Sequence, residues 1–151
     1  MKKMITIGIL CCCLSAFAQK KDNRIVIGIT DTIYSNILKE KRVMMVHVPD
    51  GDKNQRYPVL YILDGEDHFQ SAVAMVQQIS GIIPDMIVVG VTNTNRVRDL
   101  TPTHVSNPNE SGGGESFIKF IEQELAPYVD SKYPTAPYRI FSGHSLGGLT
   151  V

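Results

Sequence analysis

The chain has 151 residues, 43% of them hydrophobic, and its 15 basic side chains balance its 15 acidic ones. This composition is typical of a folded globular domain and excludes a disordered or collagen-like chain. Because the formal net charge is +0 and no basic stripe is present, the sequence indicates neither a nucleic-acid interface nor attraction to an anionic membrane.

Residues 1–18 have the pattern of a secretory signal peptide. Two lysines precede an apolar run too short to span a membrane, and Ala16-Phe17-Ala18 places small residues before a cleavage point at Gln19. A lipoprotein signal is the alternative, since the three cysteines follow an apolar stretch, but Ile9-Leu10 before them are not small. We therefore expect an exported protein, periplasmic or secreted, with no membrane span and no cysteine after cleavage, which excludes thiol chemistry.

Four segments of the mature chain are predicted to form strands, and a fifth is predicted near the end of the chain. Arg24–Ile29 and Arg42–Val48 carry β-branched residues in partial alternation, which favours antiparallel strands. Val59–Leu63 and Met86–Val91 are continuous apolar runs, typical of strands covered on both faces in a parallel sheet. Tyr138–Phe141 is a further short apolar strand.

Two helices are predicted between these strands. Apolar residues recur at helical spacing from Phe69 to Ile79, with Gly81 as a stop signal, and again from Phe117 to Tyr128. Strands that alternate with helices form βαβ units. We therefore expect an α/β fold whose sheet is mostly parallel, with antiparallel strands at its N-terminal side.

The segment Gly143-His144-Ser145-Leu146-Gly147 matches the pattern G-x-S-x-G directly after the last predicted strand. An abrupt strand-to-helix turn brings the residues two before and two after the serine together, so glycine is expected at both positions. The serine is then held in a strained backbone conformation with its hydroxyl above the C-terminal edge of the sheet. The motif predicts Ser145 as a nucleophile.

A serine nucleophile needs a base, an acid that orients this base, and two N–H donors for the oxyanion. The backbone N–H of Leu146, the residue after the nucleophile, is the first expected donor. The second normally comes from the loop after the third strand, where Asp64-Gly65-Glu66 lies. Gly65 and Glu66 both remain candidates for this donor.

Arg96, Arg98 and His68 are candidates for contacts with the substrate. The two arginines follow a buried strand, at the edge where open α/β sheets bind ligands, and could contact an anionic or carbonyl-bearing group. The alternative for them is a solvated loop charge or a pair with Asp99. His68 follows the loop that holds the second oxyanion donor and could line the substrate crevice.

Acidic residues gather beside His68, and a metal site is the alternative explanation for them. Asp64, Glu66 and Asp67 lack both the calcium-loop spacing and an H-E-x-x-H pattern. We expect no metal and no cofactor, and we expect Asp64 or Asp67 to cap the helix that follows.

The chain resembles the esterase D-like branch of the α/β-hydrolase superfamily, which includes secreted and periplasmic siderophore esterases. The resemblance covers about residues 40–151 and implies an α/β-hydrolase fold, Ser145 as nucleophile and no cofactor. It also implies hydrolysis of carboxylic esters of small molecules, carbohydrates or siderophores. It is carried by five segments, Tyr57–Gly65, Val89–Val91, Arg96–Pro102, Phe117–Tyr133 and Gly143–Leu149.

The place of the serine departs from the pattern of this superfamily. The order there is Ser, then Asp or Glu, then His, yet six residues follow Ser145 (151 − 145), and none of the four histidines stands in that order. We therefore expect both partners beyond Val151. Residues 19–151 would then be the N-terminal part of an esterase domain, truncated after the nucleophile elbow, and inactive and aggregation-prone alone.

Three hypotheses follow from these observations. The leading one is an exported serine esterase that acts through an acyl-enzyme on Ser145. The alternatives are an acyltransferase of the same fold and a non-catalytic, truncated relative that binds a ligand or is inactive.

Overall fold

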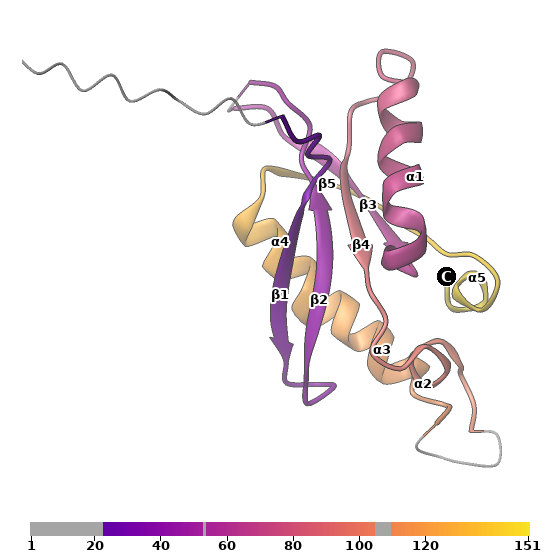
Figure 1. The fold of residues 1–151 in the computed structure, drawn as a ribbon. Helices are drawn as coiled ribbons and strands as arrows, with labels where there is room; N and C mark the ends of the chain where they lie inside the picture. The colour runs from indigo at the N-terminus through magenta and orange to yellow at the C-terminus, as the bar shows by residue number, and fades with distance from the viewer. Residues whose placement is uncertain (1–22, 53, 105–109) are drawn as a thin grey trace, which may run out of the picture.

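The structure, a computed structural model, describes residues 23–52, 54–104 and 110–151, so the predicted signal peptide lies outside the described residues. A five-stranded sheet forms the centre of the molecule, in the order β1-β2-β4-β3-β5 (Figure 1). Its strands are β1 (Ile29–Ser35), β2 (Glu40–His47), β3 (Tyr57–Leu63), β4 (Ile87–Val91) and β5 (Thr135–Ser142).

The pairing of these strands confirms the predicted fold class. β3 is parallel to both β4 and β5, whereas β2 is antiparallel to β1 and to β4. Every residue of β4 is buried, as expected for a continuous apolar strand with helices over both faces of the sheet. The sheet is therefore mostly parallel, with its antiparallel pairs at the N-terminal side.

The strand predicted at Arg24–Ile29 is wrong, because the strand begins where the prediction ends. Residues 23–28 form no strand, and Ile25 is 94% exposed. The partner strand decides this boundary: β1 pairs with β2 from Ile29 opposite Val46 to Ser35 opposite Glu40. β2 ends at His47, so the β-branched residues before Ile29 have no strand to pair with.

Helices cover both faces of the sheet, each over its own apolar cluster. On one face α1 (Gly65–Gln78) packs Phe69, Val73 and Val76 against Val88. On the other face a second helix buries Phe117, Phe120, Leu125 and Val129 against β2, β3 and β4. This second helix comprises α3 (Gly114–Phe120), one π turn η1 (Ile121–Leu125) and α4 (Ala126–Lys132).

The π turn places Glu124 against the turn between β1 and β2. The Glu124 carboxylate accepts the hydroxyl of Ser35 at 2.5 Å and the backbone N–H of Asn36 at 2.8 Å. Two N–H groups that a tight turn leaves unpaired are satisfied in this way, because Ile37 also donates to the same carboxylate at 3.3 Å. The second helix and the β1–β2 turn are thus joined by one side chain.

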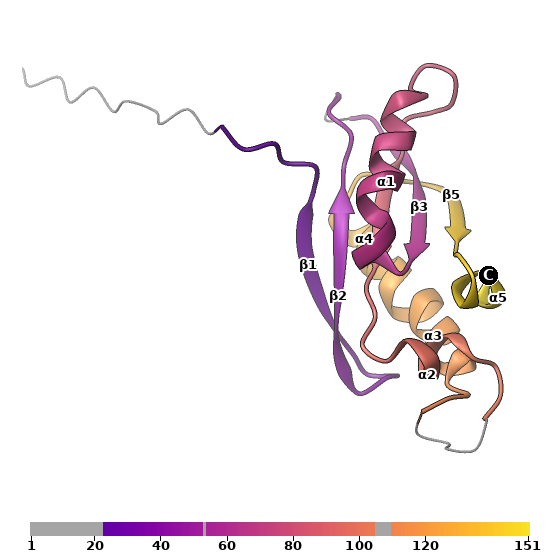
Figure 2. The ribbon, with the colours of Figure 1, turned by 45° about the vertical axis from the view of Figure 1, so that its right-hand side comes forward.

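Two short helices lie at the end of the sheet where β3, β4 and β5 stop (Figure 2). The first, α2 (Arg96–Leu100), was not predicted; the side chain of Asn95 caps it by accepting the Arg98 N–H at 3.0 Å. The second, α5 (Leu146–Thr150), follows the G-x-S-x-G turn as expected. The start of α1 lies at the same end, so this edge assembles segments from three parts of the chain.

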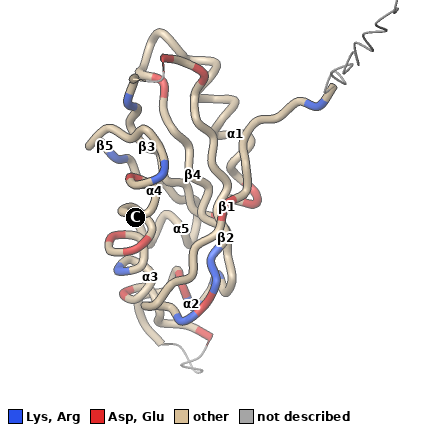
Figure 3. Tube along the Cα trace, turned by 90° about the vertical axis from the view of Figure 1, so that its left-hand side faces the viewer, with Lys and Arg blue, Asp and Glu red and all other residues tan. Residues whose placement is uncertain are grey.

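Charged residues of both signs are interspersed along the chain trace (Figure 3). Within the described ranges, none of the helices has the length and apolar character that a bilayer span requires.

Candidate active site

Ser145 occupies the turn between β5 and α5 with a left-handed backbone. Its φ is 55° and its ψ is −119°, a combination that costs free energy for any residue with a Cβ. The side chain is exposed at the C-terminal edge of the sheet. A strained, exposed serine in a strand–turn–helix context is the geometry that the motif predicts for a nucleophile.

Glycine is required at only one of the two motif positions. A Cβ added to Gly143 would lie 2.3 Å from the carbonyl oxygen of Gly147. Because this oxygen belongs to the backbone, the clash cannot be relieved by rotating a side chain. A Cβ added to Gly147 would meet no atom closer than 3.4 Å, the ordinary contact distance to Leu63 and Asp64. The expectation that both positions need glycine is therefore wrong for Gly147, because its free side faces β3 and not the turn.

This asymmetry predicts different effects of alanine at the two positions. We expect Gly143→Ala to lower the free energy of unfolding by about 2–3 kcal/mol, since overpacking must shift backbone. Gly147→Ala should change it by less than about 1 kcal/mol, because alanine favours the helix in which it lies. Urea unfolding of the two variants measures the difference, and equal losses would contradict the account of the turn.

Three backbone N–H groups at this edge have no acceptor within their own helix. Leu146 is the first residue of α5, and Gly65 and Glu66 are the first two of α1. The N–H groups of the next two residues of α1 already donate to the carbonyl of Asp64, both at 3.0 Å. The position that a Cβ would take at Gly147 lies 3.4 Å from Leu63 and Asp64, so the start of α5 is beside the start of α1.

Asp64 connects this edge to the loop after β4. Its carboxylate accepts two hydrogen bonds from Arg96, Nε to Oδ1 at 2.7 Å and Nη2 to Oδ2 at 2.9 Å, and one from Asn93 Nδ2 at 2.7 Å. The Arg96 hydrogen bonds hold the pKa of Asp64 below its usual value, against burial, which raises it. Arg96, predicted to contact substrate, therefore lies at the site, but its guanidinium is paired with Asp64.

The helix cap expected from Asp64 or Asp67 is not formed. Asp64 is the N-cap residue of α1, but no side chain caps this helix. Asp64 has a left-handed backbone, with φ 53° and ψ 48°, and its carboxylate accepts hydrogen bonds from Arg96 and not from an N–H of α1.

Arg98, the other arginine predicted to contact substrate, is paired with acidic residues of β2 and α2. It donates to Glu40 at 2.7 Å and to Asp99 at 2.7 Å, and Asp99 in turn pairs with Arg42. These groups join α2 to β2, and the pair with Asp99 is one of the alternatives named for Arg98. We leave Arg98 out of the proposed substrate site.

His68 lines an apolar pocket of about 310 Å³ next to the G-x-S-x-G turn. The pocket is bounded by β3, by α1 and by the residues from Ser142 to His144. The rings of His68 and His144 meet edge to face with centroids 5.6 Å apart. His144 was not among the predicted site residues, and its place beside the serine was the only available signal.

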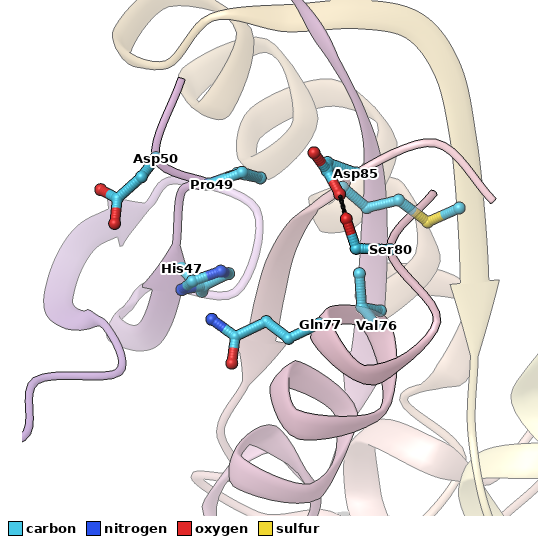
Figure 4. A pocket seen from close by; sticks show the side chains of 8 residues that line it. His47, Pro49, Asp50, Val76, Gln77, Ser80 and Asp85 are labelled. Carbon is cyan, nitrogen blue, oxygen red and sulfur yellow. Dashed lines mark hydrogen bonds between the residues drawn. The ribbon is translucent and has the colours of Figure 1, made fainter. Parts of the chain in front are cut away.

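A second pocket, of about 330 Å³, lies at the opposite end of the sheet (Figure 4). His47 and Asp85 border it, and Ser80 donates to Asp85 at 2.6 Å. His47 also contacts the carbonyl of Ile27 through Nδ1 at 2.7 Å. Among the described residues, no group of three or more His, Cys, Asp or Glu side chains could hold a metal ion.

Comparisons with a family model and with individual known proteins all identify esterases as similar to this chain. A family model described as "Putative esterase" matches residues 35–151. Ferri-bacillibactin esterase BesA of Bacillus subtilis is 37% identical over 63% of this chain and 41% of that protein. The siderophore triacetylfusarinine C esterase of Aspergillus fumigatus is 29% identical over 61% of this chain and 36% of that protein.

A solved structure agrees in fold over most of the chain. The IroE-like serine hydrolase from Shewanella oneidensis has a TM-score of 0.77 and 39% sequence identity, covering 82% of this chain and 44% of that one. The chain spans less than half the length of each of these three relatives.

Proposed function

The chain belongs to this esterase family, and from that premise we propose that it carries the nucleophile of an exported carboxylic ester hydrolase. The observation that supports the proposal most directly is Ser145, held at a φ of 55° in the turn from β5 to α5. Such a backbone costs about 1–3 kcal/mol and persists where its surroundings enforce it, typically at functional sites. A non-catalytic relative would have no use for it.

In the proposed reaction, the Ser145 hydroxyl oxygen attacks the ester carbonyl carbon while a base takes the hydroxyl proton. The negative charge that develops on the carbonyl oxygen is stabilised by the N–H of Leu146 and that of Gly65 or Glu66. The alcohol leaves with a proton from the base, and water then releases the acid from the acyl-enzyme. The base and its orienting acid are residues beyond Val151 on this proposal, in α/β-hydrolase order.

We propose a siderophore ester as the substrate. One bacterial relative is named a ferri-bacillibactin esterase, and one fungal relative is named a siderophore triacetylfusarinine C esterase. Export of the protein, proposed from the pattern of residues 1–18, would place it where such compounds are encountered. An acyltransferase of the same fold would differ only in the acceptor, an alcohol in place of water.

Covalent labelling tests the nucleophile. We expect a fluorophosphonate to add one label to the full-length exported protein, on the peptide that contains Ser145, and to add none to Ser145→Ala. Before labelling, the protein should hydrolyse a ferric trilactone siderophore, with no increase in turnover when an acceptor alcohol is added, and labelling should abolish this hydrolysis. A folded protein that takes up no label would overturn the proposal and leave the non-catalytic alternative.

A further inference from the structure

The Asp64 side chain lies among three segments of the candidate site. Its residue opens α1, its carboxylate binds Asn93 and Arg96 from the loop after β4, and Oδ2 lies 3.4 Å from the position of a Gly147 Cβ in α5. The side chain is 4% exposed. A buried carboxylate with this many charged and polar partners holds its neighbours in one arrangement.

The loop that offers the second oxyanion donor is held from the same side. Asn93 donates through Nδ2 to Glu66 at 2.8 Å as well as to Asp64, and its backbone N–H donates to Glu66 at 3.2 Å. The left-handed backbone of Asp64, φ 53°, sets the direction in which the N–H groups of Gly65 and Glu66 point. The bidentate pair with Arg96 opposes any relaxation of that backbone.

We propose that Asp64 and Arg96 are positioning residues, which fix the oxyanion N–H groups of the Gly65-Glu66 segment relative to the nucleophile turn. This inference rests on the proposed esterase function and assigns neither side chain to contact with the reacting atoms. Oxyanion donors act on charge that exists only in the transition state, so loosening them lowers kcat more than it raises KM.

The test is Asp64→Asn in the full-length protein, which keeps the shape of the side chain and removes its charge. We expect kcat for ester hydrolysis to fall about 10- to 100-fold while KM changes less than about threefold. Asp31→Asn is the matched control, because Asp31 also pairs with a cation, Lys132 at 2.7 Å, but lies on β1. This control should lose thermal stability and keep the kcat of the wild type.

A double-mutant cycle with Arg96→Gln shows whether the two residues act as one unit. We expect the double variant to have about the same kcat as Asp64→Asn, because the second change removes nothing further. Arg96→Lys, which keeps the charge but loses the bidentate geometry, should give an intermediate kcat and provides the readout if Asp64→Asn does not fold.

The outcomes separate the inference from the proposed function. Wild-type kcat in both Asp64→Asn and Arg96→Lys would overturn the positioning role while the esterase proposal stands. If Asp64→Asn and the control Asp31→Asn both lost kcat to the same extent, the loss would follow from lower stability alone. The positioning role would then also be overturned. A wild-type protein with neither label nor hydrolysis would instead refute the proposed function itself.

Discussion

Replacing Ser145 with alanine is expected to lower kcat for ester hydrolysis by about 10⁴- to 10⁶-fold, because no acyl-enzyme can form. The fold should be unaffected: Ser145 is exposed and its side chain caps no helix. Removing a hydroxyl while keeping the Cβ also leaves the backbone conformation at this position unchanged. Steady-state kinetics on an activated ester, with circular dichroism as the check on folding, measure the effect.

Ser142→Ala is the matched control for this prediction. Ser142 is the last residue of β5 and lines the same pocket as His68 and His144, but it lies outside the turn. We expect its loss to change kcat less than about threefold. If Ser142→Ala and Ser145→Ala lose activity equally, the nucleophile assignment is incorrect.

Replacing Asp99 with alanine is expected to lower the free energy of unfolding by about 3–5 kcal/mol, because it removes the buried carboxylate that Arg42 and Arg98 share and leaves the buried Arg42 with Glu40, at 2.9 Å, as its acidic partner. Arg42 and Asp99 are both 1% exposed, and Arg42 Nη1 lies 2.5 Å from Asp99 Oδ2. The same guanidinium donates to the carbonyl of Thr92 at 3.0 Å and lies over the rings of Phe117 and Phe120.

An exposed ion pair serves as the comparison for this loss. Lys119 and Glu115 are paired at 2.7 Å on the surface of α3, with side chains 51% and 83% exposed. Lys119→Ala should leave the urea midpoint almost unchanged, since solvent screens such pairs. Replacing Arg42 by methionine together with Asp99→Ala should recover much of the stability, and failure to recover would point to the hydrogen bonds of Arg42 instead.

The core of the fold could be predicted because its signals are local. The uninterrupted apolar runs of β3 and β4 identify central strands, and the apolar stripe from Phe117 identifies the second helix. The π turn in that helix was not predicted, although Pro127, which cannot donate a helix hydrogen bond, is a local signal for it; the contact of Glu124 with the N–H of Asn36, 88 residues away in the chain, could not be predicted. The start of β1 was misplaced for a similar reason, since its partner strand decides it.

In the candidate site, too, the features with local sequence signals could be predicted, and those that depend on distant residues could not. The motif around Ser145 is contiguous, so the turn and the N–H of Leu146 follow from the sequence. The partners of the two arginines do not: Arg96 and Asp64 are 32 residues apart, and Arg98 and Glu40 are 58 apart. The positions of the arginines in the sequence could not show whether a guanidinium is free to bind substrate or is already paired with a carboxylate.

The order of strands in the sheet also determines when each strand can find its neighbours while the protein is being synthesised. β3 pairs only with β4 and β5, and its last residue precedes the end of β5 by 79 positions (142 − 63). At about 5–20 residues per second, a ribosome needs about 4–16 seconds to supply the second neighbour. During that interval one flank of β3, an apolar strand at the centre of the sheet, is open to pairing with other chains.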